Sequence, residues 1–276
     1  MSIKLAFTTL GCPEWDLETI VRSAVEYGYD GIDFRGYMRE LDLHKMEQFT
    51  TRLGEAAARV RESGLEVPCV SSSARLTAYD ERTRQEALDE IKGYVEIAHA
   101  FGASFVRVFG GFLKGRTLEE ALEPTAQTLC AAAEIAKDAG MTIAVETHDD
   151  WVATVPLRCL FETAGWPEGA GPLWDVHHPY RLESEAPAFS YEQIGRETVY
   201  THWKDSRKAG DSYELTLMGE GDLPLRELFQ LVHKGGYRGW YTLEWEKWWV
   251  KYLPGPEAAF PGYVTLMRGF EEEICT

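Results

Sequence analysis

Cysteine is scarce in this sequence of 276 residues, and its few cysteines are widely scattered. The five are odd in number and form no C-x-x-C motif; they are Cys12, Cys69, Cys130, Cys159 and Cys275. Such a pattern favours neither a disulfide framework nor a zinc site built from thiolates. We therefore expect reduced, buried thiols.

Long hydrophobic runs are also missing, although 45% of the residues are hydrophobic. No stretch reaches the roughly 18 consecutive apolar residues that indicate a membrane-spanning helix. The N-terminus, MSIKLAFTTLGCPEW, has too short an apolar run to resemble a secretory signal. We expect a cytoplasmic protein with no membrane partner.

Positive charge is in deficit, with 28 Lys and Arg against 45 Asp and Glu and a formal net charge of -17. A surface of this sign repels phosphate backbones instead of releasing their counterions. The composition therefore argues against a nucleic-acid partner, but it favours no particular function.

No Pro-, Gly- or Ser-rich linker divides the chain, and one rhythm runs through it. Eight β-rich runs alternate with stretches of helical periodicity, which is typical of βα units around a parallel sheet. The runs are residues 3–9, 29–35, 66–72, 104–109, 142–148, 172–178, 198–205 and 239–246. The pattern predicts an α/β protein with one domain over residues 1–276, a single (β/α)8 TIM barrel. Residues 247–276 would form an aromatic C-terminal segment and the last helix.

The helical stretches have matching start and stop signals. Asp16 precedes the first helical pattern as an N-cap, and Gly28 follows its last turn. The segments ESGLEVP, AFGASFV, DAGMTIAV and KGGYRGW repeat this glycine between a helix and the next strand. The recurrence supports one αβ junction repeated around a barrel.

In a TIM barrel the functional side chains gather where the strands end. Four consecutive predicted strands end in oxygen or imidazole donors, namely Glu146, Asp175, His202 and Glu244. Adjacent strands lie about 4.8 Å apart, so these side chains can converge on one point. Any one of them could instead pair with an arginine or lysine at the rim. Three clustered carboxylates without a cation would repel one another, so we expect a divalent ion of the Mn²⁺, Mg²⁺ or Co²⁺ type, with Zn²⁺ also suitable.

Polar side chains two residues away would line the barrel mouth, because side chains alternate along a strand. His148 shares the face of Glu146, Lys204 that of His202, and Glu246 that of Glu244. Earlier strands add Arg107, Arg35 and Asp33, and for the last two a rim salt bridge is an equal alternative. The whole set would suit a polyhydroxylated substrate.

At these motifs the sequence resembles the xylose-isomerase-like barrels of the AP endonuclease family 2 superfamily. This superfamily includes sugar phosphate isomerases and epimerases, ketose 3-epimerases, hydroxypyruvate isomerase, inosose dehydratase and endonuclease IV. The resemblance rests on TLGCPEWDLE, GIDFRG, VETH, WDVHHP, HWKD and the stretch from GEGD to YTLEWE. It implies one Mn²⁺ or similar ion bound by Glu146, Asp175, His202 and Glu244, with the two glutamates as acid and base. It also implies that His178 lies near a substrate oxygen, whereas His177 has no assigned role.

These residues predict a metal-dependent sugar isomerase or epimerase that removes a proton next to a carbonyl through an enediolate. The substrate would be a small sugar or polyol carbonyl compound. A dehydratase or lyase acting on a keto-sugar or inosose would share the same first step, and a non-catalytic sugar-binding barrel is a further alternative. Seven histidines and the negative charge argue against a nuclease with three zinc ions.

Aromatic residues crowd the end of the eighth predicted strand; they are Trp240, Trp245, Trp248, Trp249 and Tyr252. They could stack on sugar faces or close a lid. They could equally pack in the core or cover the subunit interface of a homo-oligomer. The sequence leaves both interpretations open.

Overall fold

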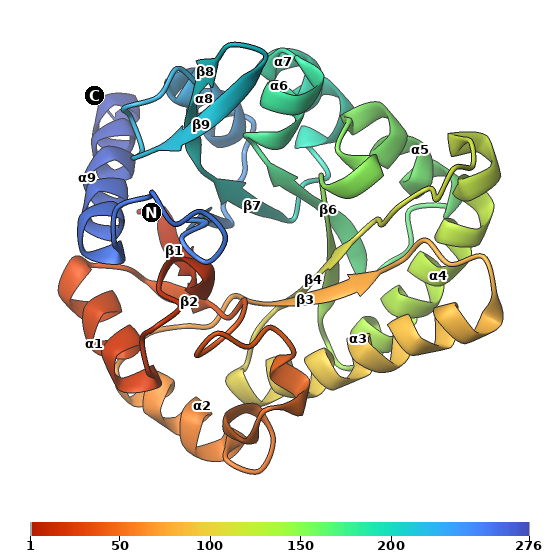
Figure 1. The fold of residues 1–276 in the computed structure, drawn as a ribbon, viewed down its shortest axis with the longest axis horizontal. Helices are drawn as coiled ribbons and strands as arrows, with labels where there is room; N and C mark the ends of the chain where they lie inside the picture. The colour runs from red at the N-terminus through yellow and green to blue at the C-terminus, as the bar shows by residue number, and fades with distance from the viewer. Residues whose placement is uncertain (1, 276) are drawn as a thin grey trace.

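The structure, a computed structural model, describes residues 2–275 and contains a single (β/α)8 TIM barrel (Figure 1). The barrel strands are β1 (Lys4–Thr8), β2 (Gly31–Asp33), β3 (Cys69–Arg75), β4 (Phe105–Phe109), β5 (Thr142–Glu146), β6 (Ala170–Asp175), β7 (Tyr200–Trp203) and β10 (Trp240–Leu243). They are hydrogen-bonded side by side in the order β2-β1-β10-β7-β6-β5-β4-β3, and every pair is parallel. The predicted fold class is confirmed.

Between β2 and β3 the barrel closes through isolated bridges instead of a continuous ladder. Gly31 pairs with Glu66, and Phe34 pairs with Val70, both in parallel. This seam is the least regular junction of the sheet.

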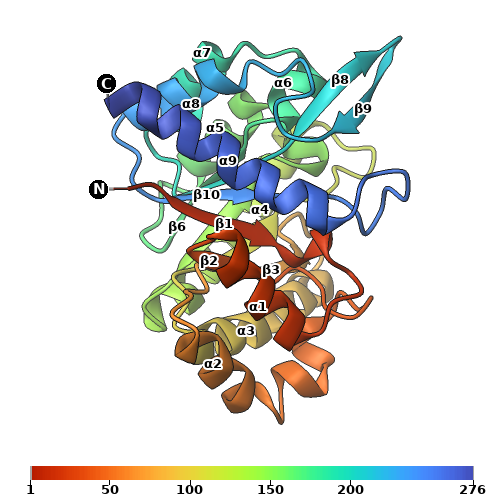
Figure 2. The ribbon, with the colours of Figure 1, turned by 90° about the vertical axis from the view of Figure 1, so that its left-hand side faces the viewer.

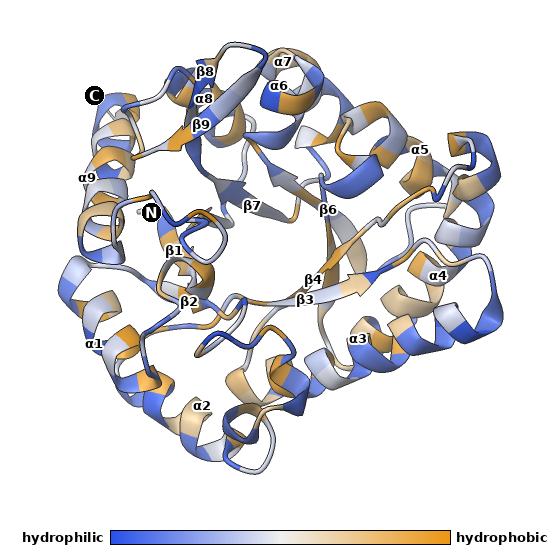
Figure 3. Ribbon diagram, viewed as in Figure 1, coloured by the Kyte–Doolittle hydropathy of each residue, from blue (hydrophilic) through white to orange (hydrophobic). Residues whose placement is uncertain are grey.

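Helices surround the strands in a ring (Figure 1). They are α1 (Leu17–Tyr27), α2 (Leu53–Glu62), α3 (Glu81–Phe101), α4 (Leu118–Asp138), α5 (Thr154–Thr163), α6 (His178–Glu183), α7 (Pro187–Ser190), α8 (Leu225–Lys234) and α9 (Pro256–Cys275). Short 3-10 turns occupy 9–11, 43–45, 47–49 and 149–151, and a π-helical turn spans 191–195. Along the outer helices, hydrophilic and hydrophobic stretches alternate, as expected of helices with one face on the core (Figure 3). No helix within residues 2–275 is long and apolar enough to cross a membrane.

The predicted caps are present. Asp16 accepts a hydrogen bond from the Thr19 backbone nitrogen at 2.9 Å, and Gly28 ends α1 in the left-handed region at φ 81°. Gly64, Gly102, Gly140 and Gly236, which follow the later helices, also have positive φ. These junctions turn the chain sharply from each helix into the next strand, because glycine adopts this conformation without a Cβ clash.

Replacing Asp16 by alanine is expected to lower the free energy of unfolding by about 1 kcal/mol, because α1 loses the acceptor for its first-turn amide. For a chain of this length we expect a fall in Tm of about 2–4 °C, measured by circular dichroism. Asp16→Ser keeps a capping oxygen and should retain most of the stability. An equal loss in both variants would contradict the capping role.

Most strand bounds differ by a few residues from the sequence prediction, and two of these differences have a clear local cause. The sixth strand ends at Asp175 and not at residue 178, because the Asp175 Oδ1 atom accepts hydrogen bonds from the backbone nitrogens of His177 and His178 and turns the chain into α6. The third strand begins at Cys69, three residues after the predicted start, since Pro68 has no N–H to donate to a ladder.

The segment after β7 forms a hairpin that the sequence analysis did not predict. Strands β8 (Asp205–Ala209) and β9 (Ser212–Thr216) pair antiparallel and project beyond the barrel (Figure 2). Asp205 fixes its base, accepting backbone hydrogen bonds from Gly219 and Gly221 at 2.9 Å each. The GEGD loop, residues 219–222, therefore anchors the hairpin before α8 begins.

Two hydrophobic cores support the site. The larger one lies between the strands and the helices. The smaller one fills the barrel interior and consists of Ala6, Cys69, Ala144, Leu173, Tyr200 and Trp240. This interior layer provides a packed floor below the polar residues at the strand ends.

The cysteines form no disulfide with one another within the described part of the chain. Cys12 and Cys69 are buried, whereas Cys130 and Cys159 are half-buried. The side chain of Cys275 lies outside the described residues.

Candidate metal centre

Four side chains converge above the barrel floor. Glu146 ends β5, Asp175 ends β6, His202 lies in β7, and Glu244 follows β10. One ligand atom of each lies within 4.8 Å of one from every other member. The backbone register explains this convergence, since Asp175 and His202 are directly paired across β6 and β7. The structure thus brings together the four residues that the sequence suggests as ligands.

His202 is oriented by a carboxylate from the opposite side of the barrel. Its Nδ1 atom lies 3.4 Å from Glu146 Oε1 and 3.5 Å from Glu244 Oε1, while its Nε2 atom lies 3.4 Å from Asp33 Oδ2. Asp33 is itself held by a 2.8 Å hydrogen bond from the Ser71 hydroxyl. A ligand histidine commonly binds a carboxylate through its second nitrogen, which fixes the ring. Sequence reasoning left Asp33 as a rim residue and missed this contact.

The two glutamates are kept ionised by positive neighbours. Burial and the charge of Glu244 act to raise the pKa of Glu146, but Arg107 and His202 outweigh them and lower it to about 2. Burial likewise opposes ionisation of Glu244, but Lys204 and His202 hold its pKa well below the usual range. Both groups can therefore bind a cation or accept a proton.

His202 responds to the same charges in the opposite direction. Burial acts to lower its pKa, yet Glu244, Asp33 and Glu146 raise it to about 10. The imidazole thus carries a positive charge among the carboxylates when no metal ion is bound. A set of three carboxylate side chains and one imidazole suits a divalent ion that takes over this charge, so the residues fit a metal.

Lys204 contributes a second positive charge to the cluster. Its Nζ atom lies 2.7 Å from Asp175 Oδ2 and 3.0 Å from Glu246 Oε1, and it also contacts Glu244. The side chain is almost completely buried. The sequence placed Lys204 on the substrate-facing side, whereas the structure shows it bound to two of the four candidate ligands.

His178 is placed differently from the strand position that the sequence suggested, since it is the first residue of α6. The structure gives its Nδ1 atom the backbone oxygen of Thr147 at 2.9 Å as a hydrogen-bond partner. Burial and the charge of Lys204 lower its pKa to about 3, so the ring is neutral. His177 is buried and bonds the Ser206 hydroxyl through Nε2 at 2.9 Å, in keeping with a supporting role.

A cavity of about 370 Å³ opens over the cluster at the barrel mouth. Its lining includes Arg35, Arg107, His148, Glu244 and Glu246, the last two of which also contact Lys204. The sequence suggests six residues for substrate contact. Four of them, Arg35, Arg107, His148 and Glu246, line this cavity, and Lys204 and His178 lie beside the candidate ligand Asp175 below it.

The aromatic residues near β10 divide among several environments. Trp240 lies at the start of β10 and belongs to the barrel floor, so it is not at the strand end as expected. Trp245 is buried and donates to the backbone oxygen of Pro254. Trp249 is 53% exposed and lines the mouth cavity, where it can stack on a sugar ring. The Tyr252 hydroxyl accepts a hydrogen bond from the Leu215 backbone on the hairpin.

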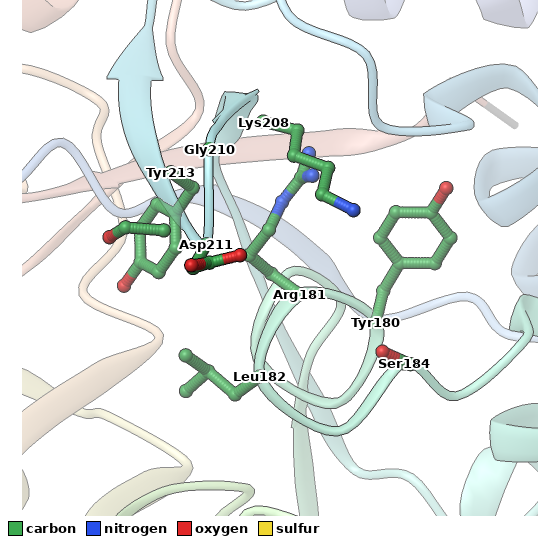
Figure 4. Close-up of a pocket in the computed structure, with 9 residues that line it drawn as sticks. Tyr180, Arg181, Leu182, Ser184, Lys208, Gly210, Asp211 and Tyr213 are labelled. Atoms are coloured by element: carbon green, nitrogen blue, oxygen red, sulfur yellow. The ribbon is translucent and has the colours of Figure 1, made fainter.

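A larger cavity, about 630 Å³, lies between α6 and the hairpin (Figure 4). Tyr180, Arg181 and Leu182 from α6 line one side, and Lys208 and Tyr213 from the hairpin line the other. None of the four candidate metal ligands lines it. The larger of these two cavities is therefore not the one that lies over the candidate metal ligands.

Comparison with known proteins finds similar chains among curated proteins and solved structures. A curated relative, fructoselysine 3-epimerase from Shigella flexneri, is 24% identical over 264 residues, covering 88% of this chain and 90% of the relative. It is an epimerase, the enzyme class that the sequence predicts. The solved structure of the IOLI protein with a bound zinc atom matches with a TM-score of 0.82 at 17% identity, covering 97% of this chain and 98% of the other.

A second solved structure, 3-keto-D-glucoside 4-epimerase from E. coli in its apo form, matches with a TM-score of 0.77 at 15% identity. The match covers 97% of this chain and 100% of that chain. A family model described as xylose isomerase-like TIM barrel matches residues 21–260, which is most of the sequence. The chain therefore belongs to the xylose isomerase-like TIM barrel family.

Proposed function

We propose that the protein is a divalent-metal-dependent sugar isomerase or epimerase. The observation that supports this most directly is the pair of buried glutamates, Glu146 and Glu244, which approach the same His202 nitrogen from different strands. Both glutamates have lowered pKa values and are ionised. A pure sugar-binding barrel has no need of two ionised carboxylates beside one imidazole.

Glu146, Asp175, His202 and Glu244 would hold the ion, with Mn²⁺ preferred and Mg²⁺, Co²⁺ or Zn²⁺ as alternatives. A bound divalent ion polarises a carbonyl and stabilises the negative charge that develops when a neighbouring proton is removed. Asp33 fixes the His202 ring, and Arg107 keeps Glu146 ionised.

Glu146 and Glu244 would act as the general base and general acid. Glu146 ends β5 and Glu244 follows β10, with β6 and β7 between those strands in the sheet. A substrate between them would present opposite faces to the two carboxylates, so that one removes a proton and the other returns it. Return to the second face gives an epimer, and return to the adjacent carbon gives an isomer.

The mouth cavity would select a polyhydroxylated substrate. His178, whose Nδ1 is occupied by Thr147, would present Nε2 to a substrate oxygen. Trp249 would cover one sugar face, while Glu246 and His148 would bond hydroxyl groups. Relatives that act on fructoselysine and on 3-keto-D-glucoside support a keto-sugar as the substrate class.

The test is hydrogen exchange at the carbon next to the carbonyl. A panel of keto-sugars in heavy water, with Mn²⁺ added, should yield at least one substrate that incorporates deuterium and converts to an epimer or isomer. A product that has lost one water molecule relative to the substrate would indicate a dehydratase instead. Metal binding without exchange in any member of a broad panel would argue for a binding protein.

Replacing Lys204 by methionine is expected to tighten Mn²⁺ binding by about tenfold or more while lowering activity. The ammonium lies 2.7 Å from Asp175 and repels any cation at the same carboxylates. Removing ~1.4 kcal/mol of this repulsion is enough to raise the affinity for Mn²⁺ tenfold. Calorimetric titration of the metal-stripped protein measures the change. Lys204→Arg keeps the charge and should bind Mn²⁺ about as weakly as the parent, so equal affinities in all three proteins would refute this explanation.

A further inference from the structure

The rim of the barrel mouth is divided by charge. The strands β5, β6, β7 and β10 bring the candidate metal ligands together on one side. The strands β2, β3 and β4, which are neighbours on the other side, bring Arg35, Arg75 and Arg107 to the same cavity. A substrate in this cavity would touch both sides at once.

Two of these arginines already have carboxylate partners. The Arg75 Nε atom lies 2.9 Å from Asp149 Oδ2, and the Arg107 Nε atom lies 3.3 Å from Glu146 Oε2. Arg107 also donates from Nη1 to the Ser72 backbone oxygen at 2.8 Å. Their charges are therefore largely compensated within the protein.

Arg35 differs from both. It is only 5% exposed, and within residues 2–275 no carboxylate lies within 4.0 Å of its guanidinium. Its side chain makes one hydrogen bond, from Nη2 to the Ser73 hydroxyl at 3.0 Å, and the buried Nη1 atom has no hydrogen-bond partner in the described residues. A buried cation without an anionic partner is costly, and an anion in the cavity would remove that cost.

Arginine suits this task because its planar donors match the oxygens of carboxylate and phosphate groups. Burial, together with the nearby charge of Arg107, lowers the pKa of Arg35 to about 10. The guanidinium still carries its charge at neutral pH. The charge of Arg107 also adds to the attraction for an anion.

We propose that Arg35 forms an anion-binding subsite at the barrel mouth, which takes a carboxylate or phosphate group of the substrate. The inference rests on the proposed function and specifies its substrate class: an acidic sugar whose carbonyl faces the metal centre and whose anionic group faces β2 and β3. Neutral keto-sugars would leave Arg35 unpaired and would bind less tightly.

Matched ligand pairs test this subsite. Binding of D-fructose 6-phosphate is compared with that of D-fructose, and binding of D-tagaturonate with that of D-tagatose, by calorimetry on the Mn²⁺-loaded protein. We expect the anionic member of at least one pair to bind about 10–100-fold more tightly. Preference in the first pair identifies phosphate as the favoured group, and preference in the second identifies carboxylate. No preference in either pair would overturn the proposal.

Substitutions at Arg35 assign the preference to this residue. Arg35→Met should abolish it, whereas Arg35→Lys should retain part of it, and the second variant serves if the first does not fold. Arg59→Gln, which breaks an exposed pair with Glu18, is the matched control and should leave the preference unchanged. A preference that survives Arg35→Met would overturn the proposal.

The binding readout separates this inference from the proposed reaction. An Arg35-dependent anion preference without any proton exchange would refute the isomerase proposal and keep the subsite. Proton exchange on neutral keto-sugars, with no anion preference, would support the isomerase proposal and refute the subsite.

Discussion

Replacing Glu244 by glutamine is expected to lower deuterium exchange on the substrate by about a thousandfold. General acid–base catalysis by one positioned group contributes roughly 10²–10⁴-fold, and an amide cannot accept or return the proton. The amide oxygen can still face the metal centre together with Glu146, Asp175 and His202, so Mn²⁺ should be largely retained. The rate of deuterium incorporation and the metal content are measured on the same preparation.

The control for Glu244→Gln is Glu162→Gln, which removes a carboxylate from an exposed ion pair with Arg158 on α5. It should leave the exchange rate within a factor of two or so, as expected of an exposed ion pair. Unchanged exchange in Glu244→Gln would refute the mechanism with two glutamates. If the variant loses both the metal and the exchange activity, Glu244 would be a metal ligand without a role as acid or base.

Replacing His202 by glutamine is expected to weaken Mn²⁺ binding by at least a hundredfold. The imidazole lies between two candidate ligands, at 3.4 Å from Glu146 and 3.5 Å from Glu244. The readout is thermal unfolding with increasing Mn²⁺, because a ligand at 100 times its Kd stabilises the folded protein by about 2.7 kcal/mol. At the same Mn²⁺ concentration the variant should show little or no stabilisation.

Asp33→Asn provides the graded comparison for His202. Outer partners of ligand histidines typically contribute about 10–100-fold to metal affinity, so this variant should lie between the parent and His202→Gln. It also retains the shape of the side chain that Ser71 holds. A stronger loss in Asp33→Asn than in His202→Gln would show that Asp33 itself is the ligand.

The sequence predicts the candidate site well where topology alone brings residues together. Glu146, Asp175 and His202 converge because parallel strands of a barrel end at one rim, and this follows from the order of the strands. Glycines such as Gly28 mark the helix ends for a local reason, their positive φ. Both kinds of inference need only spacing and residue type.

Contacts across the barrel were not predictable in this way. Asp33 and His202 are 169 residues apart, and only the tilt and closure of the sheet bring their side chains together. Lys204 is placed on the correct face by alternation, but its contact with Asp175 depends on the length and direction of the side chain. The β8–β9 hairpin was not predicted because its residues are mostly polar and lack the apolar run of a buried strand.

The irregular junction between β2 and β3 has a consequence for how the barrel is held closed. Here the isolated pairs Gly31–Glu66 and Phe34–Val70 replace a continuous ladder, so side-chain contacts between the two strands matter more than elsewhere in the sheet. Arg35 follows β2 at this junction, and its hydrogen bond to the Ser73 hydroxyl of β3 is one such contact. An anion bound by Arg35 would hold this side chain in place, and it would thereby also stabilise the closure of the barrel between β2 and β3.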